Sequence, residues 1–343
     1  MVKSNGYGHG AETAAQAALD GGASWLGVYT PDEALALRAA GFRLPMLVVG
    51  WSPPATLRPL IDEDVDITVF DATAISATAA AAVQAGKRAR VHVKLDTGLG
   101  RLGVREDDLP DVVVALRRAA DHVQVAGIFT HYADPEGNAD FTQEQHRRFL
   151  EGVVTLRPVA PDALLHTSGS AAILNFPEMH HDLVRLGIAF YGYAPREHAA
   201  TFDVRPAMSV FARVVHVKTV GPGESVGYGR TWWARTPRRI ATVAIGYGQG
   251  LPRALSNRGH MLVHGRRCLI AGTVNMDQVT VDVSDVDACA PGDEAMFFGH
   301  REGARMGADE VADLVDTIAH EVLCGVADWV PRLTIGRRSG PGG

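Results

Sequence analysis

Short apolar runs that end in a polar residue alternate with helix-like segments over the first two hundred residues. The runs are Trp25–Thr30, Met46–Gly50, Ile67–Asp71, Val91–Asp96, Val125–His131, Leu164–Ser168 and Leu183–Arg185. Helical spacing falls between them, as in Glu12–Leu19, Pro31–Ala40, Ala72–Ala85, Glu106–Ala119 and Thr142–Thr155. Strands that alternate with helices predict a parallel sheet covered by helices. With Val2-Lys3 as a truncated first strand, the count reaches the number that closes a (β/α)8 barrel.

The helical spacing disappears after about Asp203, and short strands separated by glycine and proline turns take its place. The expected strands are Val210–Thr219, Arg239–Ile245, His260–Val263, Cys268–Ile270, Val279–Val283 and Ala295–Phe298, with one helix at Gly307–Ile318. We therefore predict two domains, an α/β barrel over 1–203 and a mostly β domain over 204–343. The tail Ser339–Gly343 is expected to lack regular structure.

The composition narrows the function. A length of 343 residues suits two domains, and a net charge of −6 argues against a nucleic-acid binder that relies on phosphate contacts. The three cysteines lack metal-ligand spacing, which suits a reducing cytoplasm without a disulfide framework. His320–Cys324 resembles half of a zinc motif but lacks a second histidine, so we expect no metal. No apolar run is long enough to cross a membrane.

Polar side chains recur where the predicted strands of the barrel end. These residues are Lys3, Lys94, Asp96, His131, His166 and Arg185. In such a barrel the active site forms at the carboxyl ends of the strands and in the loops that follow. One histidine at a strand end is more often structural, but a recurrence over six repeats predicts a site.

Lys3 stands in a glycine-rich loop before a helix. Free N–H groups and the positive end of the helix dipole suit a phosphate there, and the N–H groups around Ser170 offer a second wall. The lysine is then either a point charge for the anion or an amine that forms a Schiff base with a carbonyl cofactor. By position alone, an exposed lysine at the chain tip and an ordinary serine helix cap remain alternatives.

Two further groups point to the chemistry of a small substrate. The turn after Asp96 presents Arg101, whose guanidinium would bind a carboxylate in a bidentate way, although Lys94 and Asp96 would also pair with each other. Tyr228 and Tyr247 are each flanked by glycines, which suggests close approach of the backbone to a ligand or a tight hairpin.

The chain resembles alanine racemases, which are pyridoxal phosphate (PLP) enzymes of fold type III. The resemblance covers nearly the whole chain and rests on six motifs in order: VKSNGYGHG, DTGLGRLGV, HTSGSAA, VRLGIAFYG, GYGRT and TVNMDQV. It implies that Lys3 carries the cofactor and acts as one base. Tyr228 of the partner subunit in a homodimer would be the second base, on the opposite face of the α-carbon. The family supplies D-alanine, a peptidoglycan precursor.

The resemblance also implies roles for the other residues. Arg185 faces the pyridine nitrogen, and because a guanidinium stays charged it disfavours ring protonation and favours return of a proton. Cofactor contacts are implied for Tyr7, His131, His166, Ser170, Gly187 and Ile188, of which His166 supports Arg185 or Tyr228. Substrate contacts are implied for Arg101, the Met276 backbone, Tyr247 and Asp328, and Lys94, often carbamylated in the family, orients Arg101.

Two departures from the family pattern carry expectations of their own. The family has a strand and a helix before the cofactor lysine, so we expect the first barrel strand to be truncated here. Asp328 stands where the family usually has a tyrosine. A shorter acidic side chain widens the pocket and offers an acceptor to a hydroxyl group, which predicts turnover of serine beside alanine.

Three other readings stay open on the sequence. A fold-type-III decarboxylase would be expected to face the ring nitrogen with an acidic residue rather than Arg185. A non-catalytic PLP-binding protein would be expected to consist of the barrel alone. An inactive paralogue of the racemase would share all the motifs.

Overall fold

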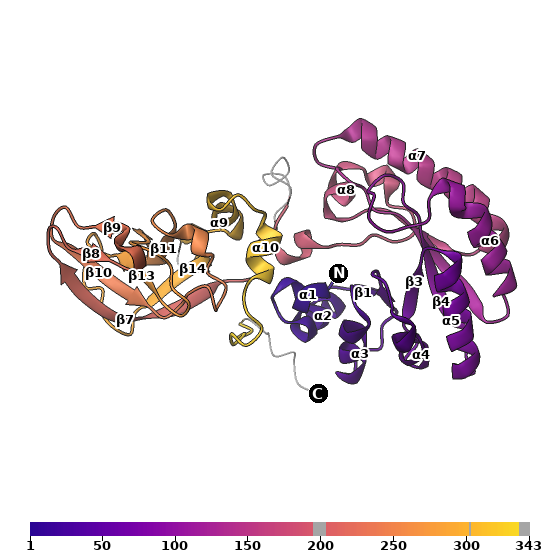
Figure 1. The fold of residues 1–343 in the computed structure, drawn as a ribbon, viewed down its shortest axis with the longest axis horizontal. Coiled ribbons are helices and arrows are strands. Elements are labelled where there is room, and N and C mark those ends of the chain that lie inside the picture. Colours follow the sequence, from indigo (N-terminus) through magenta and orange to yellow (C-terminus); the bar gives the residue numbers. More distant parts are fainter. Residues whose placement is uncertain (195–203, 302, 336–343) are drawn as a thin grey trace. The chain divides into compact units, whose positions relative to one another are not determined.

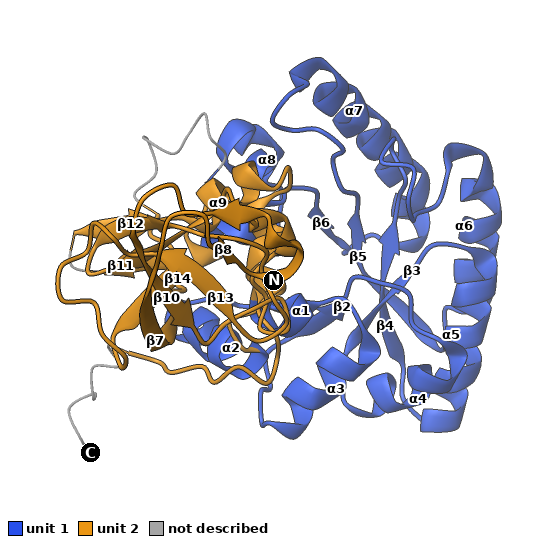
Figure 2. Ribbon diagram, turned by 60° about the vertical axis from the view of Figure 1, so that its left-hand side comes forward, with its two compact units in different colours: residues 1–6, 11–190, 194–203 blue, residues 7–10, 191–193, 204–343 orange. Residues whose placement is uncertain are grey.

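The computed structural model describes residues 1–194, 204–301 and 303–335, so the tail Ser339–Gly343 lies outside the described residues. The chain divides into two compact units (Figure 2). The first unit comprises residues 1–6, 11–190 and 194–203, and the second comprises residues 7–10, 191–193 and 204–343. Each unit is described by itself.

The first unit is built on a six-stranded parallel sheet with the strands in chain order. The strands are β1 (Leu26–Val28), β2 (Met46–Val48), β3 (Asp66–Val69), β4 (Ala89–Lys94), β5 (Val123–Phe129) and β6 (Leu164–His166). Their apolar side chains are buried on both faces; every residue of β2 and β3 is buried. The expected parallel sheet covered by helices is confirmed.

Helices lie around the outside of the sheet, one before the first strand and the others after successive strands (Figures 1 and 2). They are α2 (Ala11–Asp20), α3 (Pro31–Ala39), α4 (Pro54–Asp62), α5 (Ala72–Ala85), α6 (Leu109–Arg118), α7 (Ala139–Leu156) and α8 (Ser170–Asn175). The short segment α1 (Lys3–Tyr7) comes before them and has left-handed backbone angles. The predicted helix at Ala72–Ala85 is confirmed residue for residue. Its local signals explain this: Asp71 Oδ1 accepts from Ala74 N at 2.6 Å, and Gly86 ends the helix at φ 62°.

The two predicted strands at the ends of the barrel are wrong. Lys3 begins α1, and Leu183–Arg185 belongs to no strand. Each segment nevertheless makes a backbone hydrogen bond beside the sheet. Arg185 N donates to Ser168 O at 2.9 Å, and Val2 N donates to Gly27 O at 2.8 Å. Both segments are too short to form the repeated bonds that define a strand ladder. They occupy the positions of strands without strand geometry.

The second unit is mostly antiparallel sheet. Its main sheet has the order β12-β11-β14-β7-β10-β13, with β15 paired to β14, and a separate hairpin joins β8 to β9. These strands are β7 (Val210–Val220), β8 (Ser225–Val226), β9 (Trp232–Trp233), β10 (Arg238–Val243), β11 (His260–Val263), β12 (Arg266–Leu269), β13 (Val279–Asp282), β14 (Glu294–Arg301) and β15 (Ala304–Met306). Two helices, α9 (Ala308–Leu314) and α10 (Ala319–Cys324), complete the unit. The predicted change to a β-rich half is confirmed, although α10 was not foreseen.

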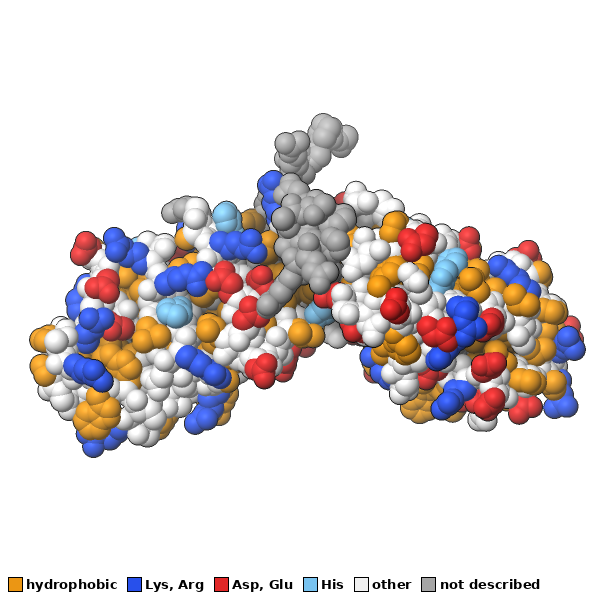
Figure 3. Space-filling view, turned by 90° about the horizontal axis from the view of Figure 1, so that it is seen from above, with side chains coloured by type: hydrophobic (Ala, Val, Ile, Leu, Met, Phe, Trp, Pro, Cys, Tyr) orange, Lys and Arg blue, Asp and Glu red, His pale blue; other side chains and the backbone are white. Residues whose placement is uncertain are grey.

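The surface carries both signs of charge. On the face shown in Figure 3, basic and acidic side chains are intermixed over each unit. None of the helices in the described part of the chain is long and apolar enough to cross a membrane.

Candidate active site

A left-handed turn follows Lys3. Ser4, Asn5 and Gly6 have φ values of 53°, 52° and 61°, and Tyr7 continues the run at 51°. An L-residue in this region costs about 1–2 kcal/mol, so three such residues beside one glycine require compensation from their surroundings. Strain of this kind persists where the surrounding structure holds it, and such positions cluster at functional sites.

Hydrogen bonds supply that compensation. The Glu33 carboxylate accepts from Ser4 N at 2.6 Å and also from the N–H groups of Tyr29 and Thr30 at 2.7 and 3.1 Å. Asn5 Oδ1 accepts from Ala11 N at 2.8 Å, which satisfies a free donor at the start of α2. The residue after Lys3 is therefore tied to the first turn of α3, and Asn5 ties the turn to the start of α2.

Positive charge gathers around His131, just beyond β5. Burial lowers the pKa of His131 from 6.5 to about 3, and the next causes are four cations: Arg185, Lys94, Arg101 and Lys3. The structure thus brings together residues that are far apart in the sequence. A group of cations with a neutral histidine suits an anionic ligand.

Lys94 is a buried amine at the end of β4. Only 6% of its surface is exposed, and its Nζ lies 5.5 Å from the Phe129 ring centroid. Burial, followed by the charges of Arg101 and Arg185, lowers the pKa of Lys94 from 10.5 to about 8. A substantial neutral fraction is therefore present just above neutral pH, when the amine becomes nucleophilic.

The loop that carries Arg101 is shaped by Asp96. Asp96 Oδ1 accepts from Gly98 N at 3.1 Å and from Gly100 N at 3.0 Å. Gly103 has φ 144°, and a Cβ there would lie 2.4 Å from Asp96 N. The Asp96 carboxylate therefore accepts hydrogen bonds from the backbone of this loop. It does more than pair with Lys94.

The guanidinium of Arg185 is almost fully saturated with acceptors. Nη1 donates to His166 Nδ1 at 2.9 Å and to His166 O at 2.8 Å. Nη2 donates to the carbonyls of Thr130 and Thr167, both at 2.7 Å, and contacts His131 Nδ1 at 3.2 Å. Within the described part of the chain, both Nη atoms of Arg185 have acceptors and Nε has none. One donor therefore remains for a ligand.

Ser170 lies where α8 begins, beside the segment that follows Arg185. Its Oγ accepts from Gly187 N at 3.0 Å and from Ala189 N at 3.3 Å. The intervening residue, Ile188, starts a 3-10 turn over Ile188–Tyr191. A hydroxyl with converging backbone N–H groups can hold a phosphate.

In the second unit, Tyr228 projects from a glycine turn. Its side chain is 73% exposed, while Thr273 Oγ1 donates to its carbonyl at 2.9 Å. Gly227 and Gly229 on either side have φ values of 78° and 72°. Backbone contacts therefore fix the turn and leave the phenol exposed.

Three other predicted residues lie on loops that touch one another in the second unit. Tyr247 N donates to Asn275 O at 3.0 Å, and a Cβ on Gly246 would lie 2.4 Å from Met276 O. The same loop meets the one before Asp328, because Ala327 N donates to Gln249 O at 3.4 Å. Arg332 holds that loop by donating from Nη1 to the carbonyls of Ala327, Asp328 and Val330.

Tyr7 groups with the second unit rather than with the lysine loop. It stacks on Tyr191 with ring centroids 4.7 Å apart and lies 5.9 Å from the His320 ring. Burial raises the pKa of Tyr7 to about 12, so the phenol stays protonated as a donor.

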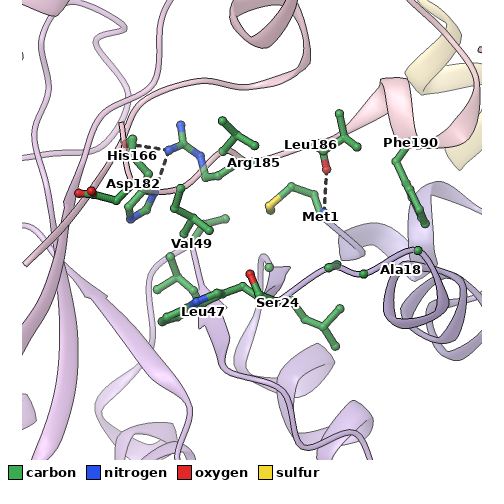
Figure 4. Close-up of a pocket in the computed structure, with 18 residues that line it drawn as sticks. Met1, Ala18, Ser24, Leu47, Val49, His166, Asp182, Arg185, Leu186 and Phe190 are labelled. Atoms are coloured by element: carbon green, nitrogen blue, oxygen red, sulfur yellow. Dashed lines mark hydrogen bonds between the residues drawn. The ribbon is translucent and has the colours of Figure 1, made fainter. Parts of the chain in front are cut away.

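A cavity of about 440 Å³ opens in the first unit, and His166 and Arg185 line one side of it (Figure 4). Most of the rest of its wall is apolar, from residues such as Leu26, Leu47 and Val49. Lys3, Lys94 and Arg101 are not among its lining residues. The cavity therefore reaches the arginine–histidine pair without containing the other cations.

Comparisons with known proteins agree with this arrangement. The family model for the alanine racemase N-terminal domain matches residues 1–195, and the model for the C-terminal domain matches residues 207–334. The chain belongs to the alanine racemase family. Alanine racemase 2 of Caldanaerobacter subterraneus subsp. tengcongensis is 38% identical over 98% of this chain and 88% of its own length. The alanine racemase of Thermobifida fusca is 40% identical over 98% of this chain and 91% of its own.

Solved structures extend the similarity to three dimensions. The alanine racemase of the D-cycloserine producer Streptomyces lavendulae superposes with a TM-score of 0.93 at 38% identity. That alignment covers 98% of this chain and 89% of the other. The barrel and β-domain architecture predicted for an alanine racemase is thereby confirmed.

Several residues around the candidate site of this alanine racemase family member were not predicted from its sequence. His92, Asp66 and Gly127 lie behind Arg185, and Glu33 clamps the lysine turn. A signal for His92 was present, because it stands two residues before Lys94 and so on the same face of β4. Among the described residues, no group of three or more His, Cys, Asp or Glu side chains could hold a metal ion.

Proposed function

We propose that this chain interconverts L- and D-alanine with PLP as cofactor. The observation that carries the proposal is the group of cations around His131, in which acceptors on both Nη atoms hold Arg185 with Nη2 3.2 Å from His131 Nδ1. This group occurs in a chain that the family models match over both domains. When bound, PLP stabilises the carbanion left after the α-proton of an amino acid is removed.

The residues present fit that cofactor. Ser170 and the N–H groups of Gly187 and Ala189 form a seat for its phosphate, with Ile188 between them. The Arg185 Nε–H would donate to an unprotonated ring nitrogen. The Lys3 amine would hold the aldehyde carbon covalently, and Tyr7 would add a donor to the phosphate.

Arg185 favours racemisation over other reactions of amino acids. Burial lowers its pKa to about 10, which leaves the guanidinium charged near neutral pH. A fixed positive charge beside the pyridine nitrogen disfavours protonation of the ring and makes it a weaker electron sink. A weaker sink would give less support to the loss of carbon dioxide and would favour quick return of a proton to the α-carbon. The charge of Arg185 thus favours a racemase over a decarboxylase.

Racemisation needs proton transfer on both faces of the α-carbon. We assign one face to Lys3 and the other to Tyr228 of the partner subunit in a homodimer with shared active sites. The exposed phenol of Tyr228, on a turn held by its backbone, supports a role toward another molecule. Arg101 and the Met276 backbone would orient the substrate carboxylate, and Tyr247 would line the entry.

Lys94 would orient Arg101 as a carbamate. The neutral amine, available because the pKa is about 8, attacks carbon dioxide, and the nitrogen releases a proton as the N–C bond forms. The product is an anion in place of a cation beside Arg101. This change relieves the repulsion among the neighbouring cations.

We further propose that serine is accepted beside alanine. Asp328 supplies a short carboxylate where the family usually has a tyrosine, and Arg332 holds its loop. Comparable turnover of L-serine and L-alanine is expected. A strong preference for alanine would contradict this part of the proposal, and Asp328→Tyr is expected to shift the preference toward alanine.

The central experiment follows purified protein with PLP and L-alanine in D₂O. D-alanine should form, and deuterium should enter the α-position of both enantiomers. Lys3→Ala should abolish both racemisation and the absorbance of covalently bound cofactor. Absence of D-alanine from a folded, PLP-loaded protein would instead favour a non-catalytic PLP-binding protein or an inactive paralogue.

A cytoplasmic location is the last part of the proposal. Its support is that Cys268 and Cys289 are free thiols. A reducing compartment keeps such thiols free. Fractionation of cells that express the chain, with enzyme activity as the readout, tests it.

A further inference from the structure

A hydrogen-bonded chain of four side chains runs behind the proposed cofactor site. Arg185 Nη1 contacts His166 Nδ1 at 2.9 Å, and His166 Nε2 contacts His92 Nδ1 at 2.8 Å. His92 Nε2 then contacts Asp66 Oδ2 at 3.1 Å. Both histidines are fully buried and Asp66 is 2% exposed. Figure 4 shows the Arg185 end of this chain at the cavity.

A glycine on β5 leaves the space that these hydrogen bonds need. His92 lies on β4 and His166 on β6, so β5 stands between them. The β5 residue opposite His92 is Gly127, and a Cβ on it would lie 2.3 Å from His92 Nδ1. Gly127 therefore leaves the space through which the two imidazoles meet across the intervening strand.

The two ends of the chain determine where its protons lie. Arg185 can only donate, so His166 Nδ1 must accept and His166 must carry its proton on Nε2. That proton is donated to His92 Nδ1, which leaves the His92 proton on Nε2 facing the Asp66 carboxylate. The opposite arrangement would set two donors against each other at Arg185 and two lone pairs against each other at Asp66.

The electrostatic surroundings agree with a neutral His166. Burial, then the charge of Arg185, lowers the pKa of His166 well below 6.5. Burial raises the pKa of Asp66, but hydrogen bonds from His92 and Arg90 outweigh it and hold that pKa below its usual value. Arg90 donates to both carboxylate oxygens, at 2.9 and 3.2 Å. Asp66 is thus a fixed anion at one end, with Arg185 a fixed cation at the other.

We propose that Asp66 and His92 are positioning residues for Arg185, and that Gly127 is the residue that lets them act. They give the buried His166 Nε2–H an acceptor, so that the ring stays in the orientation that receives Arg185 Nη1. Without that acceptor, a buried donor is left unsatisfied, and turning the ring toward another partner relieves this cost at the expense of the Arg185 contact. This inference rests on the proposed function only for its effect on catalysis.

The first test uses the cofactor-free protein with ¹⁵N-labelled histidine. NMR should show His92 and His166 as neutral rings protonated at Nε2. A scalar coupling across the hydrogen bond should join His166 Nε2 to His92 Nδ1, and the His166 Nε2 proton should exchange slowly with water. A proton on His166 Nδ1, or no coupling between the two rings, would overturn the proposal.

Three variants separate positioning from packing. His92→Gln can accept from His166 through its amide oxygen and donate to Asp66 through its amide nitrogen, so protection of the His166 proton should survive. His92→Phe keeps a ring of similar shape but offers no acceptor, so protection should be lost. Gly127→Ala alters none of the four hydrogen-bonded side chains themselves, but its Cβ displaces His92, so it should match His92→Phe.

Activity of the PLP-loaded variants completes the test. Loss of a residue that orients a functional group typically costs about 10- to 100-fold, so kcat/KM should fall by that order in His92→Phe and Gly127→Ala and be rescued in His92→Gln. Equal loss in His92→Gln and His92→Phe would show that only packing matters and would refute positioning. If His92→Phe does not fold, the parent NMR and the other two variants still decide. A coupled histidine pair in a protein that does not racemise alanine would refute the proposed function and leave the positioning geometry intact.

Discussion

The two units hold the side chains that we propose for the active site in opposite ways. In the first unit, Lys94 and His166 are buried, and Arg185 is fixed by side-chain and carbonyl acceptors. In the second, Tyr228 is 73% exposed and Met276 is 56% exposed, while hydrogen bonds hold the backbone beneath them. The first arrangement gives rigid, charged groups, and the second presents side chains from rigid turns. One protein can therefore preorganise a site either by fixing its side chains or by fixing its backbone.

This contrast has an energetic consequence. A buried charged group lowers the free energy of unfolding, because the folded state bears its desolvation cost. Replacing such a group therefore changes both stability and activity. An exposed side chain on a backbone-held turn contributes little to folding. Substitutions in the first unit should therefore change activity and stability together, whereas those at the tips of the second unit should change activity alone.

The largest expected effect is that of Tyr228→Phe. Loss of a general base should lower racemisation about 10²- to 10⁴-fold, since one face of the α-carbon loses its proton donor and acceptor. The free energy of unfolding should change by less than about 0.5 kcal/mol, because the side chain is exposed. Steady-state kinetics and denaturant titration measure the two quantities. One enantiomer should still exchange its α-proton in D₂O through Lys3, and loss of this exchange would contradict the two-base assignment.

Lys94→Met should stabilise the protein while it impairs activity. The folded protein releases the Lys94 proton at a pKa of about 8 and the unfolded chain at 10.5, so the unfolded state binds more protons between these values. Parent stability therefore rises with pH across this window, and the cost of the buried cation is greatest below it. The variant should gain roughly 3 kcal/mol near neutral pH and lose this advantage above pH 10.5. Urea titrations in bicarbonate-free buffer check this, and an advantage that grows with pH would disprove it.

Gly103→Ala should destabilise the Arg101 loop more than Gly100→Ala does. Both glycines have positive φ, so an alanine at either position is strained by about 1–2 kcal/mol. Only at Gly103 does the new Cβ meet backbone, 2.4 Å from Asp96 N, which should add about 1–3 kcal/mol and raise KM by displacing Arg101. Nothing lies within 4 Å of the Cβ at Gly100, so that variant is the matched control. Equal unfolding free energies for the two variants would exclude the steric explanation.

The smallest expected effect is that of Glu33→Gln. An amide replaces a carboxylate that accepts from Ser4, Tyr29 and Thr30, which should cost about 1 kcal/mol and loosen the turn after Lys3. Thermal unfolding and kcat measure the two effects. Asp71→Asn, at the start of α5, is the control, because it weakens a helix cap that is not part of the site. A drop in kcat for the control as large as that for Glu33→Gln would deny the turn a specific role.

Local signals predicted most of the regular structure. Thr30 and Glu33 form a complete capping box at the start of α3, and Asp71 caps α5. Such signals depend on residues a few positions apart, so they can be read without the fold. The same holds for the strand ends, because period and turn residues mark where each strand of the first unit stops.

Other features could not be predicted from local patterns. The left-handed turn of Ser4 and Asn5 depends on acceptors at Glu33 and on a donor at Ala11, which only the folded chain supplies. Leu183–Arg185 has a strand-like composition but makes too few backbone bonds to form one. Both are cases in which tertiary contacts override local preference.

The sequence alone determined the order of elements, the family and the candidate residues, because hydrophobic period, helix caps and motif order are properties of neighbouring residues. Only the tertiary structure decided which of those residues meet. His92 and His166 are 74 positions apart, and they touch because Gly127 leaves a gap in the strand between them. Such contacts depend on the register of the sheet and on the space that one absent side chain leaves, and neither is encoded at a single point along the chain.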